Sequence, residues 1–181
     1  MNLPRTPSFR LDGRRALVTG GGRGLGAAAA VALAQAGATV YPAARSMDEI
    51  AALVEAIRSE GGKAEALKLD VTDIPTMHAR LQAIDPFDIL VNNAGTNRPK
   101  PMLEVTLDDY DAVEGLNLKA AYFVAQAVVS GMVSAKRSGC VINISSQMGH
   151  VGATELTRMP FGANSTAIAL VRPSTACLVA Q

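Results

Sequence analysis

The stretch Leu-Val-Thr-Gly-Gly-Gly-Arg-Gly-Leu-Gly, at residues 17–26, decides the fold of this 181-residue chain. It begins in a short apolar run, continues as a glycine loop and leads into an alanine-rich segment with a helical pattern. Glycines let backbone N–H groups approach a phosphate closely, and the positive end of the following helix attracts the same anion. A glycine cluster alone is also typical of a flexible turn, but a strand before it and a helix after it favour a site for a dinucleotide pyrophosphate.

Strand and helix patterns alternate along the chain. Apolar runs that predict buried strands fall at 15–19, 38–43, 64–69, 87–91 and 141–144, with helical patterns between them at 25–36, 47–59, 73–83 and 106–133. Near-continuous apolar strands separated by helices predict a doubly wound parallel sheet of the α/β class. We expect residues 1–10 to form a flexible arm and residues 11–181 to form one domain. Pro42 removes a donor from the second strand, which is therefore either interrupted there or hydrogen-bonded on one side only.

Composition excludes several functional classes. A net charge of +1 and a pI of about 7.8 give no electrostatic reason for binding nucleic acid or an anionic membrane. The first ten residues carry prolines and charges where a signal peptide needs an apolar stretch, and the alanine-rich segment 27–38 is only weakly apolar. The two cysteines suit a reducing compartment. We expect a cytoplasmic protein without a metal site.

Four further motifs follow the glycine loop in order. They are Asp70-Val71, Asn92-Asn93-Ala94-Gly95, Asn117 in Gly-Leu-Asn-Leu-Lys, and the run from Ile142 to Gly149 that contains Ser145-Ser146. Each alone has a plain structural explanation, such as a strand-end cap, a turn, a solvated helix residue or a loop serine. Together with the glycine loop they resemble the short-chain dehydrogenase/reductase family over roughly residues 11–172. The resemblance implies a Rossmann-like fold and hydride transfer between NAD(P)(H) and a carbonyl or alcohol, similar to ketoreductases of the 3-oxoacyl class.

The resemblance also implies the site residues. Asp70 would bond the adenine amino group, Asn117 would hold a proton-relay water, and Ser146 would polarise the substrate oxygen. Ser146 is a better candidate than Ser145 because the family's serine stands three residues before the loop glycine, here Gly149. The residues expected to contact the dinucleotide are Thr19, Gly20, Arg23, Gly24, Leu25, Gly26, Arg45, Asp70, Val71, Asn93, Ala94 and Gly95.

The choice of cofactor depends on the end of the second strand. An acidic residue there would bond the adenosine ribose hydroxyls and repel a 2′-phosphate. The sequence Ala43-Ala44-Arg45 carries no acid, and both Arg45 and Arg23 in the glycine loop can pair with that phosphate. The two arginines could instead be solvated surface residues. The sequence favours NADP(H) over NAD(H).

The pair that moves protons in the family, Tyr-x-x-x-Lys, is missing from this sequence. None of Tyr41, Tyr110 and Tyr122 is followed four residues later by lysine. The best match to the family's tyrosine helix is the stretch 161–172, which places Phe161 at the tyrosine position and Ser165 at the lysine position. Phenylalanine has no hydroxyl to donate a proton, and serine has no charge to lower the pKa of a phenol.

The sequence leaves three functions open. Pro173 ends the helix predicted over 161–172, and family members continue beyond the length of this chain, so we expect a sheet that is incomplete on its C-terminal side. The chain is an impaired NADP(H)-dependent oxidoreductase, an inactive dinucleotide-binding or interaction module, or a non-functional gene fragment left by truncation or frameshift.

We expect the chain to form homo-oligomers. The resemblance implies a dimer or a tetramer, and apolar area that the incomplete sheet leaves uncovered also favours self-association. Five apolar residues of the long helix are available for a core or a partner face: Leu107, Val113, Leu116, Val124 and Val128.

Overall fold

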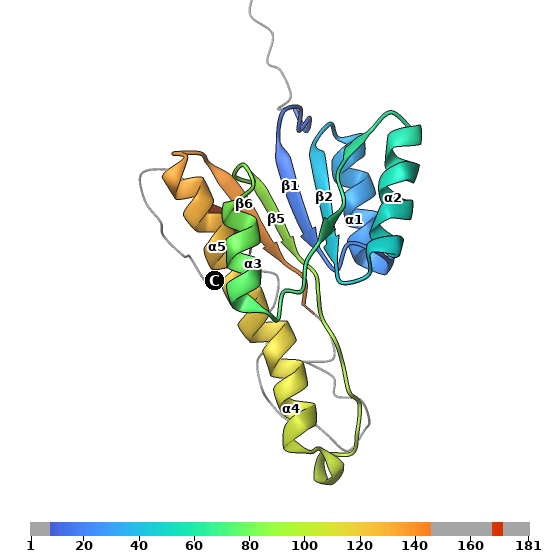
Figure 1. The fold of residues 1–181 in the computed structure, drawn as a ribbon, viewed down its shortest axis with the longest axis vertical. Coiled ribbons are helices and arrows are strands. Elements are labelled where there is room, and N and C mark those ends of the chain that lie inside the picture. Colours follow the sequence, from blue (N-terminus) through green and yellow to red (C-terminus); the bar gives the residue numbers. More distant parts are fainter. Residues whose placement is uncertain (1–7, 146–167, 172–181) are drawn as a thin grey trace, which may run out of the picture.

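The computed structural model describes residues 8–145 and 168–171, which form a seven-stranded sheet with helices on both faces (Figure 1). The strand order is β3-β2-β1-β5-β6-β7, with β4 also paired to β2, and every pairing is parallel except that of β6 with β7. The predicted doubly wound parallel sheet is confirmed. The strands are β1 (Arg15–Thr19), β2 (Thr39–Ala44), β3 (Lys63–Ala64), β4 (Leu67–Lys68), β5 (Ile89–Asn92), β6 (Gly139–Asn143) and β7 (Ile168–Val171).

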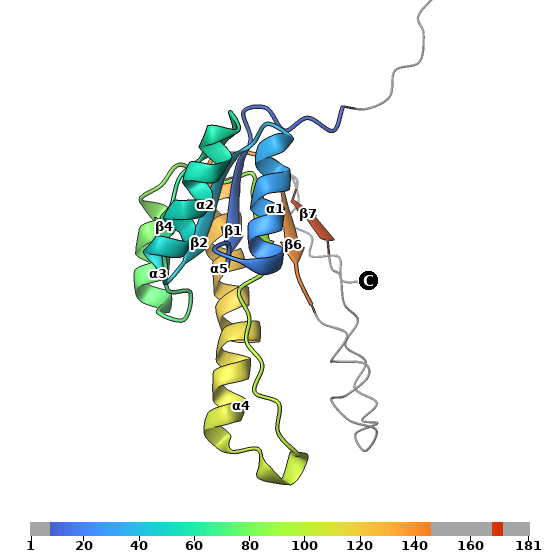
Figure 2. The same cartoon turned by 90° about the vertical axis from the view of Figure 1, so that its right-hand side faces the viewer.

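The helices divide between the two faces of the sheet (Figure 2). On one face α1 (Gly24–Gln35) and α2 (Met47–Ser59) share a core with Ala16 and Val18 of β1, with α1 lying on β1 and β2 and α2 lying on β2 and β3. On the other face α3 (Ile74–Gln82) and α5 (Ala121–Ser134) pack together and share a core with Leu17. Alternate residues of a strand point to opposite faces, so the continuous apolar run of β1 is buried on both sides.

The helix α1 lies close to the sheet because its inward side is small. Gly26, Ala30 and Ala34 are buried along this side at helical spacing. The helix ends where Gly37 adopts a positive φ of +105°, a conformation that suits a residue without a side chain. This end agrees with the helical pattern predicted over 25–36.

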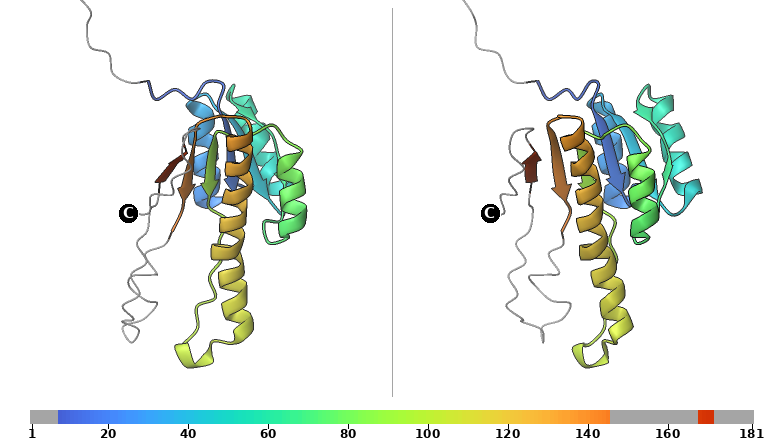
Figure 3. Two further views of the ribbon diagram at one scale, coloured as in Figure 1. Left: turned by 90° about the vertical axis from the view of Figure 1, so that its left-hand side faces the viewer. Right: turned by 60° about the vertical axis from the view of Figure 1, so that its left-hand side comes forward.

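A long helical rod projects past the carboxyl ends of the strands (Figures 1 and 3). The sequence predicts one helix over 106–133, and the structure forms α4 (Leu107–Glu114), a π-helical turn η2 (Gly115–Ala120) and α5 in continuous succession, after a short 3-10 helix η1 (Met102–Glu104). By length and composition alone the rod could cross a membrane. Core helices of globular domains pass the same test, and α5 buries Val124, Val128 and Met132 in the core. We therefore assign the rod to the domain.

Pro42 does not interrupt β2, and β2 pairs with β1 on one side and with β3 and β4 on the other, so the expected one-sided hydrogen bonding holds only at Pro42 itself. Thr39 N–H donates to Arg14 O at 2.8 Å, and Gly21 N–H donates to Ala43 O at 3.1 Å. The odd-numbered residues of β2 therefore bond towards β1, and the nitrogen of Pro42 faces the other side. The strand predicted over 64–69 is split there into β3 and β4, since proline offers no N–H to bridge them.

The helix predicted over 161–172 is wrong in its described part. Residues Ile168–Val171 form β7, which pairs antiparallel with β6 (Figure 3). Two features favour a strand here: isoleucine and valine suit an extended backbone, and β6 would otherwise leave its outer edge unpaired. Residues 161–167 lie outside the described part of the chain.

A buried carboxylate joins three strands at the amino edge of the sheet. The side chain of Asp88 is only 1% exposed and accepts hydrogen bonds from the N–H of Arg15 at 2.8 Å, from Arg14 at 3.2 Å and from Arg137 at 2.8 Å. Its own carbonyl oxygen accepts from the N–H of Cys140 at 2.9 Å. Each strand that begins near this carboxylate is thus held in place relative to the others.

Replacing Asp88 by asparagine should lower the free energy of unfolding by about 1.5–3 kcal/mol, because hydrogen bonds to a charged group contribute that much. Urea denaturation measures the change. Asp85→Asn makes the same substitution at an exposed position three residues away and should change the free energy by less than about 0.5 kcal/mol. Equal losses in the two variants would contradict a structural role for the Asp88 carboxylate.

Candidate dinucleotide site

The glycine loop lies where the order of strands reverses. From β1 the chain first proceeds to β2 on one side, and it later returns to β5 on the other side of β1. In an open parallel sheet such a switch point forms a crevice at the carboxyl ends of the strands, where ligands bind. The ends of β1 and β5, at Thr19 and Asn92, form this crevice.

A network of hydrogen bonds joins the two strand ends. The hydroxyl of Thr19, which is buried, accepts from the N–H of Asn93 at 3.0 Å and from the N–H of Ala94 at 3.1 Å, and it donates to Val91 O at 3.4 Å. In return the carboxamide of Asn93 donates to Thr19 O at 3.1 Å and to Gly20 O at 3.2 Å. The loop after β1 is therefore fixed to the turn after β5.

The loop is packed too closely for side chains at three of its glycines, Gly20, Gly21 and Gly26. Gly20 has φ of +63°, and a Cβ there would lie 2.9 Å from the Cα of Ala94. A Cβ at Gly26 would overlap the carbonyl oxygen of Gly20. These glycines bring the start of α1 against the end of β1, so that the backbone itself faces the crevice.

The N-terminus of α1 is left without a side-chain cap. Its N-cap residue, Arg23, makes no capping hydrogen bond, and the first turn contains no acidic residue. By contrast, α4 begins with a capping box in which Thr106 and Asp109 satisfy each other's backbone N–H groups. The first N–H groups of α1 remain available for an anion, which the helix dipole also attracts.

Two arginines lie at this edge of the sheet with exposed side chains. Arg23 is in the glycine loop and Arg45 directly follows β2; within the described residues neither forms an ion pair. Near Arg45, the Oδ1 atom of Asp70 accepts from the N–H and the hydroxyl of Thr72, at 2.9 and 2.6 Å. These bonds, with a smaller contribution from the charge of Arg45, hold the pKa of Asp70 below its ordinary value. The other oxygen of this carboxylate, Oδ2, has no hydrogen-bond donor within residues 8–145 and could accept from a ligand.

Asn117 lies on the π-helical turn and holds the segment that follows β5. Its Oδ1 accepts from the N–H of Thr96 at 2.8 Å, and its Nδ2 donates to Thr96 O at 2.8 Å. Single π-helical turns occur frequently at functional sites. Among the described residues, one N–H and one lone pair of the carboxamide have no partner and could bind a water.

The structure thus brings the expected cofactor residues to one edge of the sheet. Those on the β1 and β5 side are Thr19, Gly20, Arg23, Gly24, Leu25, Gly26, Asn93, Ala94 and Gly95, and those beyond β2 are Arg45, Asp70 and Val71. Ser145 is exposed just after β6. Ser146, Phe161 and Ser165 lie outside the described residues, so their roles stay predictions.

Sequence reasoning missed a polar pair that supports the site. The carboxamide of Asn92 donates to the Oδ1 of Asn143 at 3.0 Å and to the carbonyl of Ala121 at 3.0 Å. The two asparagines are partners in the register of β5 and β6. Both are the last residues of neighbouring apolar strands, a pattern that pointed to this contact.

Comparison with known proteins identifies the family. A sequence profile described as short chain dehydrogenase matches residues 14–160, and the chain belongs to this family. Curated relatives include an uncharacterized oxidoreductase of Mycobacterium tuberculosis, 42% identical over 150 residues, with 80% of this chain and 57% of the relative covered. Another is the 3-oxoacyl-(acyl-carrier-protein) reductase of Vibrio harveyi, 40% identical over 148 residues, with 80% of this chain and 59% of the relative covered.

Solved structures give the same result. A short-chain type dehydrogenase/reductase from Mycobacterium marinum has a TM-score of 0.77 and 34% identity, with 80% of this chain and 60% of that one covered. A gluconate 5-dehydrogenase from Burkholderia cenocepacia, crystallised with NADP and tartrate, has a TM-score of 0.74 and 39% identity, with 83% and 58% covered. This chain therefore spans less than two thirds of the length of these relatives.

Replacing Gly26 by alanine should weaken dinucleotide binding. The new methyl group meets the carbonyl of Gly20, so the loop must shift relative to the start of α1, and we expect the affinity to fall by about tenfold or more. Isothermal titration calorimetry with NADPH measures the effect. Gly115→Ala is the matched control, since a Cβ there meets open space, and its affinity should stay unchanged. Unaltered affinity in Gly26→Ala would show that the loop does not bind the ligand.

Proposed function

We propose that this chain is an NADP(H)-dependent oxidoreductase that transfers hydride between a carbonyl and an alcohol, that it binds NADP(H) in the crevice between β1 and β5, and that the loss of the Tyr-x-x-x-Lys pair impairs its chemistry. The observation that carries the proposal is the Thr19–Asn93 network, which presents the glycine loop and the uncapped N-terminus of α1 to one crevice. A backbone cradle with free N–H groups fits a pyrophosphate.

Each part of the dinucleotide has partners in this chain. Backbone N–H groups of the glycine loop and of the first turn of α1 hold the pyrophosphate, and Asp70 accepts from the adenine amino group. Arg23 and Arg45 hold the 2′-phosphate, and the turn Asn93–Gly95 contacts the nicotinamide half. When bound, the dinucleotide supplies the hydride donor or acceptor.

The preference for NADP(H) rests on charge at the adenosine end. Arg23 and Arg45 are exposed and free of carboxylate partners in the described structure, so they are available for a phosphate. The gluconate 5-dehydrogenase of Burkholderia cenocepacia, a structural relative, was crystallised with NADP.

The chain should bind NADPH about 10- to 150-fold more tightly than NADH, because well-formed charge-assisted hydrogen bonds contribute about 1.5–3 kcal/mol. Ala44→Asp should reverse the preference by repelling the 2′-phosphate and bonding the ribose hydroxyls. Ala44→Asn, of the same size but uncharged, should not reverse it. Equal affinities of the unaltered chain for both dinucleotides in calorimetric titration would contradict the proposal.

The chemical step is expected to be weak in this chain. Ser146 would polarise the substrate oxygen and Asn117 would hold a relay water, while Phe161 stands where the family has its proton-donating tyrosine and Ser165 stands at the lysine. General acid catalysis contributes about 10²–10⁴-fold to rate, and this contribution would be missing.

Reduction of ketones should therefore be slow or undetectable by NADPH absorbance. The double variant Phe161→Tyr with Ser165→Lys should recover a trace of activity, whereas neither single variant should, because the phenol needs the neighbouring charge to lower its pKa. Turnover of the unaltered chain in the ordinary range of roughly 1–10³ s⁻¹ would show that another residue acts as the acid.

The alternative functions are separable by experiment. A chain that binds NADPH and melts cooperatively but turns over none of a panel of ketones is a dinucleotide-binding or interaction module. A chain without a cooperative melt is a gene fragment that does not fold alone. If the chain folds, whether as an enzyme or as a binding module, we propose that it is located in the cytoplasm.

Self-association is the last part of the proposal. Of the helix residues named for a core or partner face, Val124 and Val128 lie in the core, Val113 and Leu116 are half-buried, and Leu107 is exposed. Further exposed apolar side chains on the rod are Leu118 and Tyr122, which are 64% and 62% exposed. Exposed apolar area of this kind favours a partner surface.

Sedimentation should therefore show dimers or larger species. Leu118→Glu should shift the distribution towards monomers, because it places a charge in apolar area that a partner would cover. Val133→Glu, at an exposed position near the other end of the rod, should not. A sharp monomer peak for the unaltered chain would contradict the proposal.

A further inference from the structure

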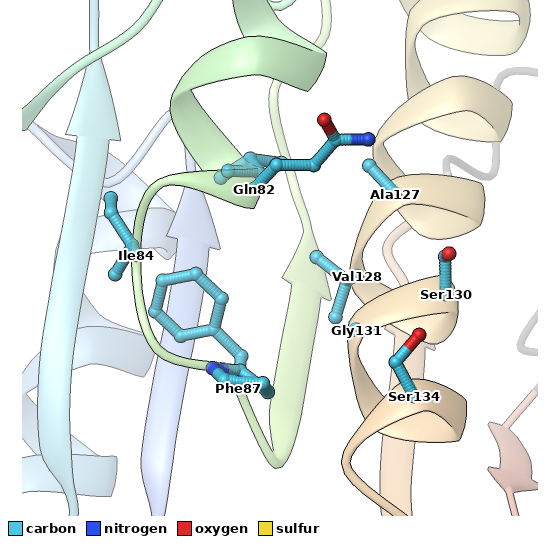
Figure 4. A pocket seen from close by; sticks show the side chains of 10 residues that line it. Gln82, Ile84, Phe87, Ala127, Val128, Ser130, Gly131 and Ser134 are labelled. Atoms are coloured by element: carbon cyan, nitrogen blue, oxygen red, sulfur yellow. The ribbon is translucent and has the colours of Figure 1, made fainter.

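The projecting end of the rod is held by a charged contact. At its other end the rod is fixed in the core, where the side chain of Val128 points towards the ring of Phe87 (Figure 4). In α4, whose residues are all described, Asp109 alone is buried, while Leu107 and Tyr110 are 74% and 59% exposed. A buried carboxylate destabilises a fold unless it is paired, so the partners of Asp109 determine how this end of the rod is held.

Two cations from the segment that follows β5 reach this carboxylate. Arg98 donates to the Oδ1 of Asp109 at 3.4 Å, and Lys100 donates to its Oδ2. The hydroxyl of Thr106 also donates to Oδ2, at 2.6 Å. The bonds from Lys100 and Thr106 hold the pKa of Asp109 well below its ordinary value. The carboxylate therefore stays ionised at physiological pH and can hold both cations.

The same segment, residues 96–100, is bonded to the rod a second time beside the crevice, and we call it the strap. Thr96 exchanges two hydrogen bonds of 2.8 Å with the carboxamide of Asn117. From Asp109 to Asn117 the rod extends by about 12 Å, and an extended chain covers about 13 Å from Thr96 to Lys100. The strap therefore fits along the rod, beside which it lies (Figures 1 and 2), when it is stretched between its two contacts.

The crevice end of the strap adjoins the turn that we assign to the nicotinamide half of the dinucleotide. A Cβ at Gly95 would lie 3.3 Å from the Oδ1 of Asn117, so this carboxamide packs directly against the backbone of the turn. Gly95 is also the residue before Thr96 in the chain. A movement of the strap would thus displace both Asn117 and the turn.

We propose that Asp109 is a positioning residue for the nicotinamide end of the crevice. By binding both cations of the strap it keeps the strap stretched along the rod, and the stretched strap keeps the Thr96–Asn117 pair closed. Within the described residues Asp109 bonds no group that we assign to the dinucleotide or to proton transfer. The inference rests on the proposed function for its ligand, whereas the contacts themselves can be tested without one.

Amide hydrogen exchange of the full, unliganded chain, followed by NMR, tests the positioning role. The double variant Arg98→Met with Lys100→Met removes both charges and retains the capping box of Thr106 and Asp109. The amide of Thr96 should then exchange at least about tenfold faster, because the strap is no longer held at its far end. Asp109→Asn should have the same effect. If Asp109 only capped α4, the double variant would leave the exchange of Thr96 unchanged.

Two controls separate the effect of charge from other effects of substitution. Arg98→Lys with Lys100→Arg retains both charges and should keep the exchange of Thr96 as slow as in the unaltered chain. Asp108→Asn removes the neighbouring carboxylate, which is exposed, and should have no effect. Amides of β5 report on global unfolding. If Asp109→Asn does not fold, the methionine variant decides, because both side chains that it replaces are exposed.

Bound NADPH gives a readout that a helix cap alone would not change. In the methionine variant, at saturating protein concentration, the fluorescence anisotropy of the nicotinamide should fall because the ring gains local motion. The Kd should rise by less than about threefold, since the pyrophosphate and the 2′-phosphate have partners of their own. Unchanged exchange at Thr96, or faster exchange with an unchanged nicotinamide signal, would overturn the positioning role. Failure of the unaltered chain to bind NADPH would overturn the proposed function, while the exchange rates would still decide whether Asp109 holds the strap.

Discussion

The hydroxyl of Thr19 is the contact on which the dinucleotide crevice depends. It accepts two backbone N–H groups from the turn after β5 and donates to a carbonyl of β5, so all of its hydrogen-bonding capacity is used inside the fold. The Thr19 hydroxyl must be buried to keep these hydrogen bonds, because water would otherwise compete for the same donors and acceptor. The glycine loop can then be free of side chains and still be held in one place.

Charged and polar groups have different roles at the two edges of the sheet. At the amino edge the carboxylate of Asp88 is buried and fully paired, so charge is used there to fix the strands. At the carboxyl edge the charged and polar groups are exposed, or satisfied on one side only: the start of α1 lacks a cap, Arg45 has no carboxylate partner in the described structure, and Asp70 keeps one oxygen free. Groups left unsatisfied on a rigid frame are the ones that can bind a ligand.

The sequence was sufficient where the determining interactions are local. The glycine loop, the alanine-rich side of α1 and its end at Gly37 follow from steric properties of single residues, and the structure confirms them. Long-range pairing could not be predicted in the same way. The split of the third strand beside Pro42 depends on which side of β2 the proline nitrogen faces, and that side is set by the register with β1. The wrong helix at Ile168–Val171 has a similar cause, because the pattern of small and apolar residues is compatible with a helix until the unpaired edge of β6 offers an alternative.

The residues proposed to bind the dinucleotide and the positions proposed for the proton-transfer pair lie in separate stretches of this chain. The groups that form the dinucleotide crevice all lie between Thr19 and Asn117, and they are held by contacts among themselves, such as those of Asn93 with Gly20 and of Asn117 with Thr96. Both partners of each of these contacts lie in that range, and positions 161 and 165 follow it in the sequence. We therefore expect substitutions at the crevice to alter mainly the proposed dinucleotide affinity, and substitutions at positions 161 and 165 to alter mainly the proposed proton transfer.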